Sequence, residues 1–323
     1  MINIGILYGG YSSEFEISKK SATTIFNNFP KALKPYLIEV TRDNWYAIIG
    51  EKKIELNIWE LTFFTDQKNE LDAFLIYTHG KPGENGQLQA YLEMREKPVI
   101  NSGFLASALS FDKWYCNQFL RNFNIPVADS IVLNKTTEIN IKQIIQKLSL
   151  PCFVKPTDSG SSFGISKVKK ESDLIQSIEN AFKEGNRVVI ESNLAGVEVT
   201  CGIYNTKNGL ITLPITEIVS ENDFFDYDAK YNGKSNEIIP ARISETIEHK
   251  IYELSKEIYE LLNLKSVARI DFMIVDNKPT VIEVNTTPGF SSASIVPQML
   301  NYANIKIEDF WNEIITFELA DLI

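Results

Sequence analysis

The residues "ARIDFMIVDNKPTVIEVNTTPG", 268–289, carry the strongest signal in the chain. They read as two strands joined by a short turn, which brings Asp271 close to Glu283 and Asn285. The two-residue period of a strand puts the last two on the same face. Two carboxylates and an amide oxygen form a site of the kind that magnesium prefers, with positions left open for phosphate oxygens. The alternative is a solvated hairpin edge with incidental charges.

The length of the turn bears on this site. Eleven residues separate Asp271 from Glu283. If the side chains of Asp271 and Glu283 face the same side of the hairpin, the loop must have an odd number of residues, about three or five around 276–278. A shift of one residue would reverse the face of every side chain. An even loop without a bulge would point Asp271 away from the metal.

The glycine-rich stretch "CFVKPTDSGSSFGIS", residues 152–166, is the second signal. Lys155 ends an apolar strand and precedes small residues whose backbone N–H groups can approach phosphate oxygens. The lysine precedes the glycines, so this is not a Walker A motif. Alone, the stretch fits a hairpin turn as well as a phosphate clamp; beside the predicted magnesium site, the clamp is favoured.

Two further stretches offer polar groups. In "VVIESNLAGVEVT", 188–200, Glu191 and Glu198 are either surface carboxylates or acceptors for an adenine amino group and ribose hydroxyls. The aromatic loop "FFDYDAKYNG", 224–233, fits a surface loop as well as a functional one. Since residues 220–238 have no continuous apolar stripe, we expect them to be mobile without ligand and to close over the site through Lys230.

The N-terminal stretch "ILYGGYSSEFEIS", 6–18, reads as a strand, a tight turn and a helix start. Phosphates often bind at such a helix end, but here Glu14 and Glu16 lie in its first turn and would repel one. The spacing is also not that of a dinucleotide-binding motif. Ser13 and Glu16 predict a capping box, while Glu14 is better placed to receive a cation.

Composition limits the class of protein. With 323 residues, 44% of them hydrophobic, the chain can bury two or three cores. The formal charge of −10 argues against nucleic-acid and anionic-membrane partners and favours a small-molecule substrate. Three widely spaced cysteines predict neither disulfides nor zinc. We expect a cytoplasmic protein that is neither exported nor membrane-spanning.

The element pattern predicts an α/β protein of three domains, with boundaries at 1–112, 113–196 and 197–323. The first domain alternates strands and helices, which favours a parallel sheet, and the second has short strands typical of an antiparallel layer with helices on one face. The expected strands are 2–8, 36–41, 73–78, 151–155, 163–169, 187–191, 197–204, 210–219 and the hairpin 267–285. The expected helices are 18–28, 103–123, 138–148, 172–183 and 244–262.

Four motifs, in order along the chain, resemble those of the D-alanine–D-alanine ligase family of the ATP-grasp superfamily. They are Gly9-Gly10-x-Ser12-x-Glu14-x-x-x-Ser18, His79-Gly80-x-x-Gly83-Glu84-Asn85-Gly86, the Lys155 glycine loop, and Arg269-Ile270-Asp271 with Glu283-x-Asn285-Thr286-x-Pro288-Gly289. The resemblance extends from residue 3 to about residue 300. It implies an ATP-grasp fold of the α/β (α+β) class, with ATP between the central and C-terminal domains.

The resemblance also implies roles for individual residues. For ATP, it implies phosphate contacts from Lys113, Lys155, Ser162 and Lys230, and adenosine contacts from Glu191, Leu194 and Glu198. For the metal, it implies two magnesium ions, with manganese as an alternative, on Asp271, Glu283 and Asn285. For catalysis and substrate binding, it implies Glu14 with Ser161 and Tyr231 at the first ammonium, Arg269 and the Gly289 N–H at the oxyanion, and His79, Ser294 and Ile295 at the substrates.

The implied reaction is ATP-dependent formation of D-alanyl-D-alanine through an acyl phosphate, for peptidoglycan synthesis. We expect D-alanine and ATP as the small-molecule partners and a homodimer as the assembly. Two alternatives stay open: another ATP-grasp carboxylate–amine ligase, such as one that makes a D-alanyl-D-lactate ester, and a nucleotide-binding module without catalysis. The three lysines, Arg269 and three metal ligands count against the last, since a pure binder needs no oxyanion donor.

Overall fold

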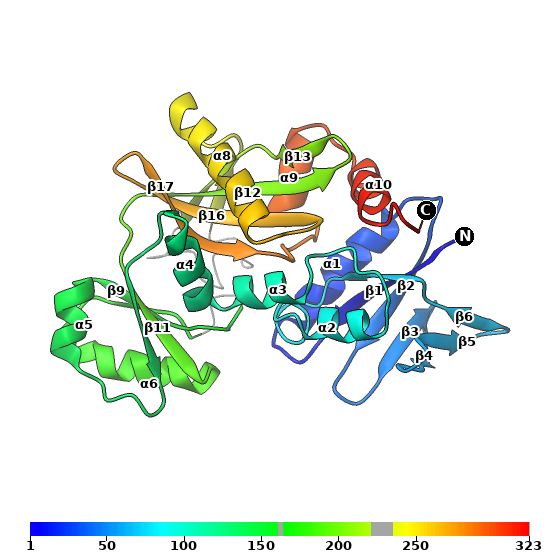
Figure 1. The fold of residues 1–323 in the computed structure, drawn as a ribbon, viewed down its shortest axis with the longest axis horizontal. Coiled ribbons are helices and arrows are strands. Elements are labelled where there is room, and N and C mark those ends of the chain that lie inside the picture. The colour runs from blue at the N-terminus through cyan, green and yellow to red at the C-terminus, as the bar shows by residue number, and fades with distance from the viewer. Residues whose placement is uncertain (161–163, 221–234, 323) are drawn as a thin grey trace.

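A computed structural model describes residues 1–160, 164–220 and 235–322. Figure 1 shows three groups of strands with helices packed around them. The N-terminal group and the strands of residues 130–192 lie at opposite ends of the view, and the strands that follow residue 196 lie above and between them. The closing loop was predicted at 220–238; its two ends are strand residues, Ser220 at the end of Thr216–Ser220 and Ser235–Ile238, which pair with each other. Residues 221–234 lie outside the described residues, so the predicted closing stays untested.

The N-terminal sheet has the strand order β4-β3-β2-β1-β7. Its core is parallel, as the sequence predicts, because β1 pairs in parallel with both β2 and β7. β3 and β4 extend it with antiparallel pairs that the sequence analysis missed. The bounds here are β1 Asn3–Gly9, α1 Phe15–Asn27, β2 Lys34–Val40, β3 Trp45–Ile49, β4 Lys52–Leu56, β5 Thr62–Phe64, β6 Lys68–Glu70, β7 Ala73–Ile76 and α2 Gln87–Met94.

The central sheet has the order β10-β9-β11-β8 and is antiparallel throughout. It has its own cluster of buried side chains, formed with α5 and α6, and this arrangement confirms the small antiparallel layer that the short strands predict. The bounds are β8 Ser130–Asn134, α5 Ile141–Leu148, β9 Cys152–Pro156, β10 Ser166–Val168, the 3-10 helix η1 Glu171–Asp173, α6 Leu174–Glu184 and β11 Arg187–Ser192.

The C-terminal sheet has the order β15-β14-β12-β16-β17, with β13 also paired to β12. The expected single strand 210–219 is two strands, interrupted at 213–215, where Pro214 cannot donate a ladder hydrogen bond. The bounds are β12 Val197–Thr206, β13 Gly209–Thr212, β14 Thr216–Ser220, β15 Ser235–Ile238, α8 Glu245–Leu261, β16 Val267–Val275, β17 Lys278–Asn285, α9 Ile295–Tyr302 and α10 Ile307–Glu318.

The expected helix 103–123 is two helices, α3 Phe104–Phe111 and α4 Lys113–Asn122. The break is at Asp112, whose extended backbone begins the second helix and whose carboxylate accepts hydrogen bonds from the backbone N–H groups of Trp114 and Tyr115. Although α4 precedes the central sheet in the chain, it packs in the hydrophobic cluster of the C-terminal sheet. Its first residue, Lys113, donates its backbone N–H to the carbonyl oxygen of Thr157, just after β9, so α4 contacts both the central and the C-terminal parts.

The N-terminal and C-terminal parts share one hydrophobic cluster. It includes Tyr77 after β7, Phe290 after β17, and Phe310 and Trp311 on α10. Tyr77 makes edge contacts with Phe290 and Trp311, at ring-centroid distances of 6.0 and 5.8 Å. Because these side chains are fully buried, the segment that follows β17 is fixed against the N-terminal sheet.

Candidate active site

The β16–β17 hairpin places its polar residues on one face, by a different route from the one predicted. The loop has two residues, Asp276 and Asn277, both in the left-handed region with φ of 49° and 60°. The prediction of an odd-numbered loop is therefore wrong. A register shift between Asp271 and Phe272 makes Ile282 an extra residue, and this bulge brings Asp271 opposite Glu283.

Asp271 is held by several donors. Nε and a terminal nitrogen of Arg269 bond its two carboxylate oxygens, each at 2.8 Å. Thr200 Oγ1 donates to Oδ1 at 2.5 Å, and the side-chain amide of Asn285 donates to Oδ2 at 3.2 Å. The bidentate ion pair balances the charge of a carboxylate that is almost fully buried. The predicted metal ligands therefore lie together, on a preformed polar network.

The oxygen donors of this face fit a hard divalent cation. They are two carboxylates and an amide, which magnesium and manganese both accept. In the described residues, no group of three or more His, Cys, Asp and Glu side chains is arranged for a metal. An ion held here would therefore take its remaining ligands from water or phosphate oxygens. Lys113 Nζ lies 3.8 Å from Glu283 Oε2, which adds a positive charge beside the same donors.

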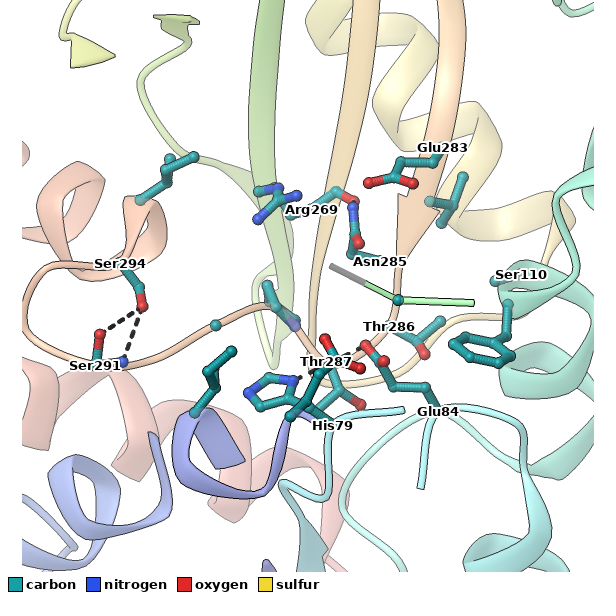
Figure 2. Close-up of a pocket in the computed structure, with 18 of the residues that line it drawn as sticks. His79, Glu84, Ser110, Arg269, Glu283, Asn285, Thr286, Thr287, Ser291 and Ser294 are labelled. Atoms are coloured by element: carbon teal, nitrogen blue, oxygen red, sulfur yellow. Dashed lines mark hydrogen bonds and ion pairs between the residues drawn. The ribbon is translucent and has the colours of Figure 1, made fainter. Parts of the chain in front are cut away.

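A cavity of about 400 Å³ lies between this hairpin, α1 and the start of α9. In Figure 2, Arg269, Glu283 and Asn285 lie on one side of it and His79 and Glu84 on the opposite side. The predicted residues that line it are Glu14, His79, Lys113, Arg269, Glu283, Asn285, Gly289, Ser294 and Ile295. Residues that come from four distant parts of the chain are thus brought to one space.

A smaller cavity of about 110 Å³ adjoins the larger one between the central and C-terminal sheets. Both cavities are lined by Lys113, Ile165 and Glu283. The predicted residues that line the smaller one are Lys113, Lys155, Glu191, Leu194, Glu198, Asp271 and Glu283. Ser161, Ser162, Lys230 and Tyr231 lie outside the described residues, so their predicted roles stay untested.

Lys155 and Glu191 form an ion pair in the smaller cavity, with 2.7 Å between Nζ and Oε2. The other oxygen of Glu191 accepts a hydrogen bond from the side-chain amide of Asn117 at 3.0 Å. Burial lowers the pKa of Lys155, but the carboxylates of Glu191, Glu283 and Glu198 together outweigh it, so the pKa of Lys155 lies above the usual value. Lys155 is therefore held as a buried cation at the edge of the cavity.

The carboxylate of Glu14 is enclosed between its own turn and the loops that carry Gly80 and Gly160. Its side chain is buried, and a side chain at Gly160 would collide with it. A Cβ on Gly80, whose φ is +64°, would lie 2.8 Å from Oε2 of Glu14. Glycine is required at position 80 because its φ is positive and because a Cβ there would lie too close to Glu14. This enclosure is why Glu14 lies at the larger cavity and not on the helix surface.

The predicted capping box at the start of α1 is wrong. Glu14 is itself the N-cap residue, and no side chain caps the helix there. Ser12, not Ser13, interacts at this turn: its hydroxyl donates to the carbonyl oxygen of His79 at 3.0 Å and accepts from the Glu14 N–H at 3.3 Å. The partner of Ser12 is 67 residues away, so no local pattern indicates it.

Ser294 is the N-cap residue that precedes α9, and it lines the same cavity as Gly289. Its hydroxyl oxygen accepts from the Ser291 N–H at 3.0 Å and lies 2.9 Å from the Ser291 hydroxyl, as Figure 2 shows. A Cβ on Gly289 would lie 3.1 Å from the same oxygen. The backbone of 289–295 therefore forms a tight turn whose polar groups lie at the cavity wall.

Two acidic residues of the larger cavity, Glu84 and Glu237, have no role predicted from the sequence. Glu84 belongs to a quoted motif, and its carboxylate accepts from the Gly80 N–H at 2.7 Å. Glu237 comes from β15, where burial raises the pKa of its carboxyl group, opposed by a hydrogen bond from Gln298 and by Arg269. The motif could have indicated Glu84, whereas no pattern around Glu237 distinguishes it from a surface acid.

Comparisons with known proteins agree with this geometry. Two family models match, "D-ala D-ala ligase N-terminus" over residues 3–102 and "D-ala D-ala ligase C-terminus" over 119–316. The D-alanine–D-alanine ligase of Flavobacterium johnsoniae is 44% identical over 324 residues, covering 99% of this chain and 100% of the relative.

Two solved structures are similar over nearly their whole length. The VanG D-Ala:D-Ser ligase of Enterococcus faecalis has a TM-score of 0.87 at 30% identity, covering 98% of this chain and 99% of its own. The Bacillus anthracis D-alanine–D-alanine ligase complexed with ATP has a TM-score of 0.79 at 28% identity, covering 99% and 98%. The expected α/β ATP-grasp fold is confirmed. By sequence and by structure, the chain belongs to the D-alanine–D-alanine ligase family.

Proposed function

We propose that the protein joins two D-alanine molecules into D-alanyl-D-alanine, with conversion of ATP to ADP and phosphate, for peptidoglycan precursor synthesis. Family membership supports the reaction. The observation that carries it is the meeting of two cavities at Lys113 and Glu283. A nucleotide in the smaller cavity would present its phosphates to amino acids in the larger one.

The smaller cavity has the groups that a nucleotide needs. Glu191, Leu194 and Glu198 would contact the adenosine, and Lys113, Lys155, Ser162 and Lys230 would contact the phosphates. The buried positive charge of Lys155 supports a phosphate contact, since the attraction between opposite charges is stronger where water is excluded. Two magnesium ions, or manganese ions, on Asp271, Glu283 and Asn285 would neutralise charge on the transferring phosphoryl group.

In the first step, a carboxylate oxygen of one D-alanine attacks the γ-phosphorus of ATP, and ADP leaves. This forms an acyl phosphate, which is needed because a carboxylate oxygen is a poor leaving group until it is phosphorylated. The enclosed carboxylate of Glu14, with Ser161 and Tyr231, would bind the ammonium of this D-alanine, and His79 would contact the substrate. A charge-assisted hydrogen bond of this kind orients the substrate carboxylate toward the phosphates.

In the second step, the deprotonated amine of the other D-alanine attacks the acyl carbon, and phosphate leaves. Arg269 and the Gly289 N–H would stabilise the negative oxygen that forms on this carbon. Ser294 and the Ile295 N–H would bind the second carboxylate at the start of α9, where helix N–H groups favour an anion. The bidentate pair with Asp271 supports the role of Arg269, since it fixes the guanidinium plane.

Phosphate release tests this function. The protein, with ATP and magnesium, is given D-alanine alone, and then D-alanine with L-alanine, D-lactate or D-serine as the second substrate. We expect release with D-alanine alone and identification of the dipeptide by mass. Preferred release with D-lactate or D-serine would instead indicate another ligase of this superfamily, and binding of ATP without release would indicate a non-catalytic module.

We also propose a cytoplasmic homodimer with domains at 1–112, 113–196 and 197–323. In the part of the chain that the structure describes, no helix is long and apolar enough to cross a membrane. The separate hydrophobic cluster of the central sheet supports a central domain. The exposed side chains of Met94 on α2 and Leu105 on α3 support a protein partner. Light scattering on the purified protein tests the dimer, and limited proteolysis tests the boundaries.

A further inference from the structure

Helix α1 presents two buried hydroxyls, Ser18 and Ser21, to the rest of the molecule. Ser21 lies between His79, which follows β7, and Phe290, which follows β17. Its Oγ is 3.1 Å from Nε2 of His79, and it accepts a hydrogen bond from the Phe290 N–H, also at 3.1 Å. One oxygen atom thus connects a side chain of the larger cavity with the turn that carries Gly289.

The hydrogen bonds of Ser21 determine where the proton of His79 lies. The backbone N–H of Phe290 can only donate, so the Ser21 oxygen accepts this bond. Among the described residues, the only other partner of the Ser21 hydroxyl is His79 Nε2. The hydroxyl proton is satisfied only if it points to that nitrogen, since a buried O–H without an acceptor is unfavourable. Nε2 is then an acceptor, and the ring proton of neutral His79 is on Nδ1.

Glu84 supports the same assignment from the other side of the ring. Its Oε1 lies 4.0 Å from Nδ1 of His79, and its other oxygen is held by the Gly80 N–H. A protonated Nδ1 is attracted by this carboxylate, whereas a lone pair there would be repelled. The backbone of His79 is fixed as well, through the hydrogen bond from Ser12.

We propose that Ser21 is a positioning residue, which holds His79 as a neutral Nδ1–H donor at the cavity and anchors the turn 288–290 with the same oxygen. That His79 acts on the amino-acid substrate rests on the proposed function. The order serine, histidine, glutamate is similar to a hydrolase triad, but Ser21 is fully buried and accepts a backbone N–H. It is therefore not a nucleophile.

The tautomer can be measured directly, because the chain has only two histidines. Nitrogen-15 labelling of histidine, with spectra that correlate ring nitrogens and ring protons, identifies which nitrogen carries the proton. His249 is exposed on α8 and serves as the internal reference. We expect His79 in the substrate-free protein to carry its proton on Nδ1. A proton on Nε2 would overturn the proposal.

Two serine variants separate positioning from folding. Ser21→Ala removes the hydroxyl donor, and we expect a mixture of tautomers and a kcat reduced about two- to tenfold, with an unchanged KM for ATP. Ser18→Ala is the matched control. The Ser18 hydroxyl is equally buried, accepts from Gly9 N–H at 2.7 Å and donates to the Tyr77 carbonyl at 2.6 Å. The Ser18→Ala protein should be less stable than wild type, but its His79 should keep the Nδ1–H tautomer.

A folded Ser21→Ala protein with the wild-type tautomer and kcat would contradict the proposal. If this variant does not fold, the spectrum of the wild-type protein still decides the tautomer. The tautomer is measured without substrate, so this experiment does not depend on the ligase assay. If the Nδ1–H form is found but the protein has no ligase activity, the proposed function is refuted and the role of Ser21 in positioning His79 is not.

Discussion

The β16–β17 hairpin and the first turns of α1 both supply the larger cavity, but their polar side chains find partners in different ways. Asp271 is bonded by Arg269, two residues away, and by Asn285, fourteen residues away. Ser21 is bonded to His79 and Phe290, which are 58 and 269 residues away. Among the described residues, three of the four hydrogen bonds to Asp271 thus come from its own hairpin and the fourth from Thr200 on β12, whereas both partners of Ser21 are brought to it by the tertiary fold.

The largest effect on activity is expected for the hairpin. Glu283→Gln should reduce turnover to less than about a tenth of wild type, at least about 1.4 kcal/mol of added barrier, because a neutral amide cannot replace a metal-binding anion. Steady-state kinetics measures this, and calorimetry with manganese measures the loss of metal binding.

Asp276→Asn is the matched control for the hairpin. Asp276 is an exposed acid in the turn of the same hairpin, and asparagine tolerates its left-handed backbone. This variant should keep wild-type turnover. More than a tenth of the activity in Glu283→Gln, with manganese still bound, would contradict the metal assignment.

This comparison also shows what the sequence could predict. The face shared by Asp271, Glu283 and Asn285 was predictable, because strand period and pairing are local. The bulge at Ile282 was not, since either an odd loop or an even loop with a bulge gives the same facing pair. At α1, Ser13 and Glu16 match a capping box, yet Glu14 is drawn to the cavity by loops around Gly80 and Gly160. Contacts across such separations leave no periodic signal.

The second prediction concerns the packing that brings the two regions together. Phe290→Ala should lower the free energy of unfolding by about 3–5 kcal/mol, because it leaves a cavity against Tyr77, Phe310 and Trp311. Chemical denaturation measures the change. Phe64→Ala, at a more exposed position on β5, is the control and should change stability by about 0.5 kcal/mol or less. Equal effects would mean that the shared cluster does not join the regions.

The third prediction separates the two substrates at α1. Glu14→Gln should weaken the first D-alanine about ten- to a hundredfold, since a charge-assisted hydrogen bond contributes about 1.5–3 kcal/mol. The apparent constant for ATP should hardly change. Glu16→Gln, an exposed acid of the same turn, should affect D-alanine less. If Glu14→Gln weakens ATP instead, or neither ligand, the first-substrate site lies elsewhere.

The smallest effect is expected for an ion pair away from the reacting groups. Arg242 donates to the buried carboxylate of Glu217 through its backbone N–H and guanidinium, and these bonds hold the pKa of Glu217 below its usual value. The pair therefore stabilises the fold above the unfolded pKa, and this stability is lost as pH falls through the folded pKa.

Glu217→Gln should thus be less stable than wild type near neutral pH, and the difference should shrink in acid. Unfolding at about pH 7 and about pH 3 measures it. Glu253→Gln removes a partner of an exposed pair with Lys256 and should have little effect at either pH. If the free energy of unfolding of Glu217→Gln differs from that of wild type by the same amount at both pH values, the ion pair with Arg242 is not the source of the stability.

The formation of an acyl phosphate is the central claim, and isotope transfer tests it most directly. D-Alanine labelled with heavy oxygen in its carboxylate is supplied with ATP and magnesium, and the released phosphate is analysed by mass. The attacking oxygen of the first D-alanine leaves with the phosphate in the second step. One phosphate is released for each dipeptide, and it should carry one labelled oxygen. Dipeptide formation with unlabelled phosphate would contradict the account.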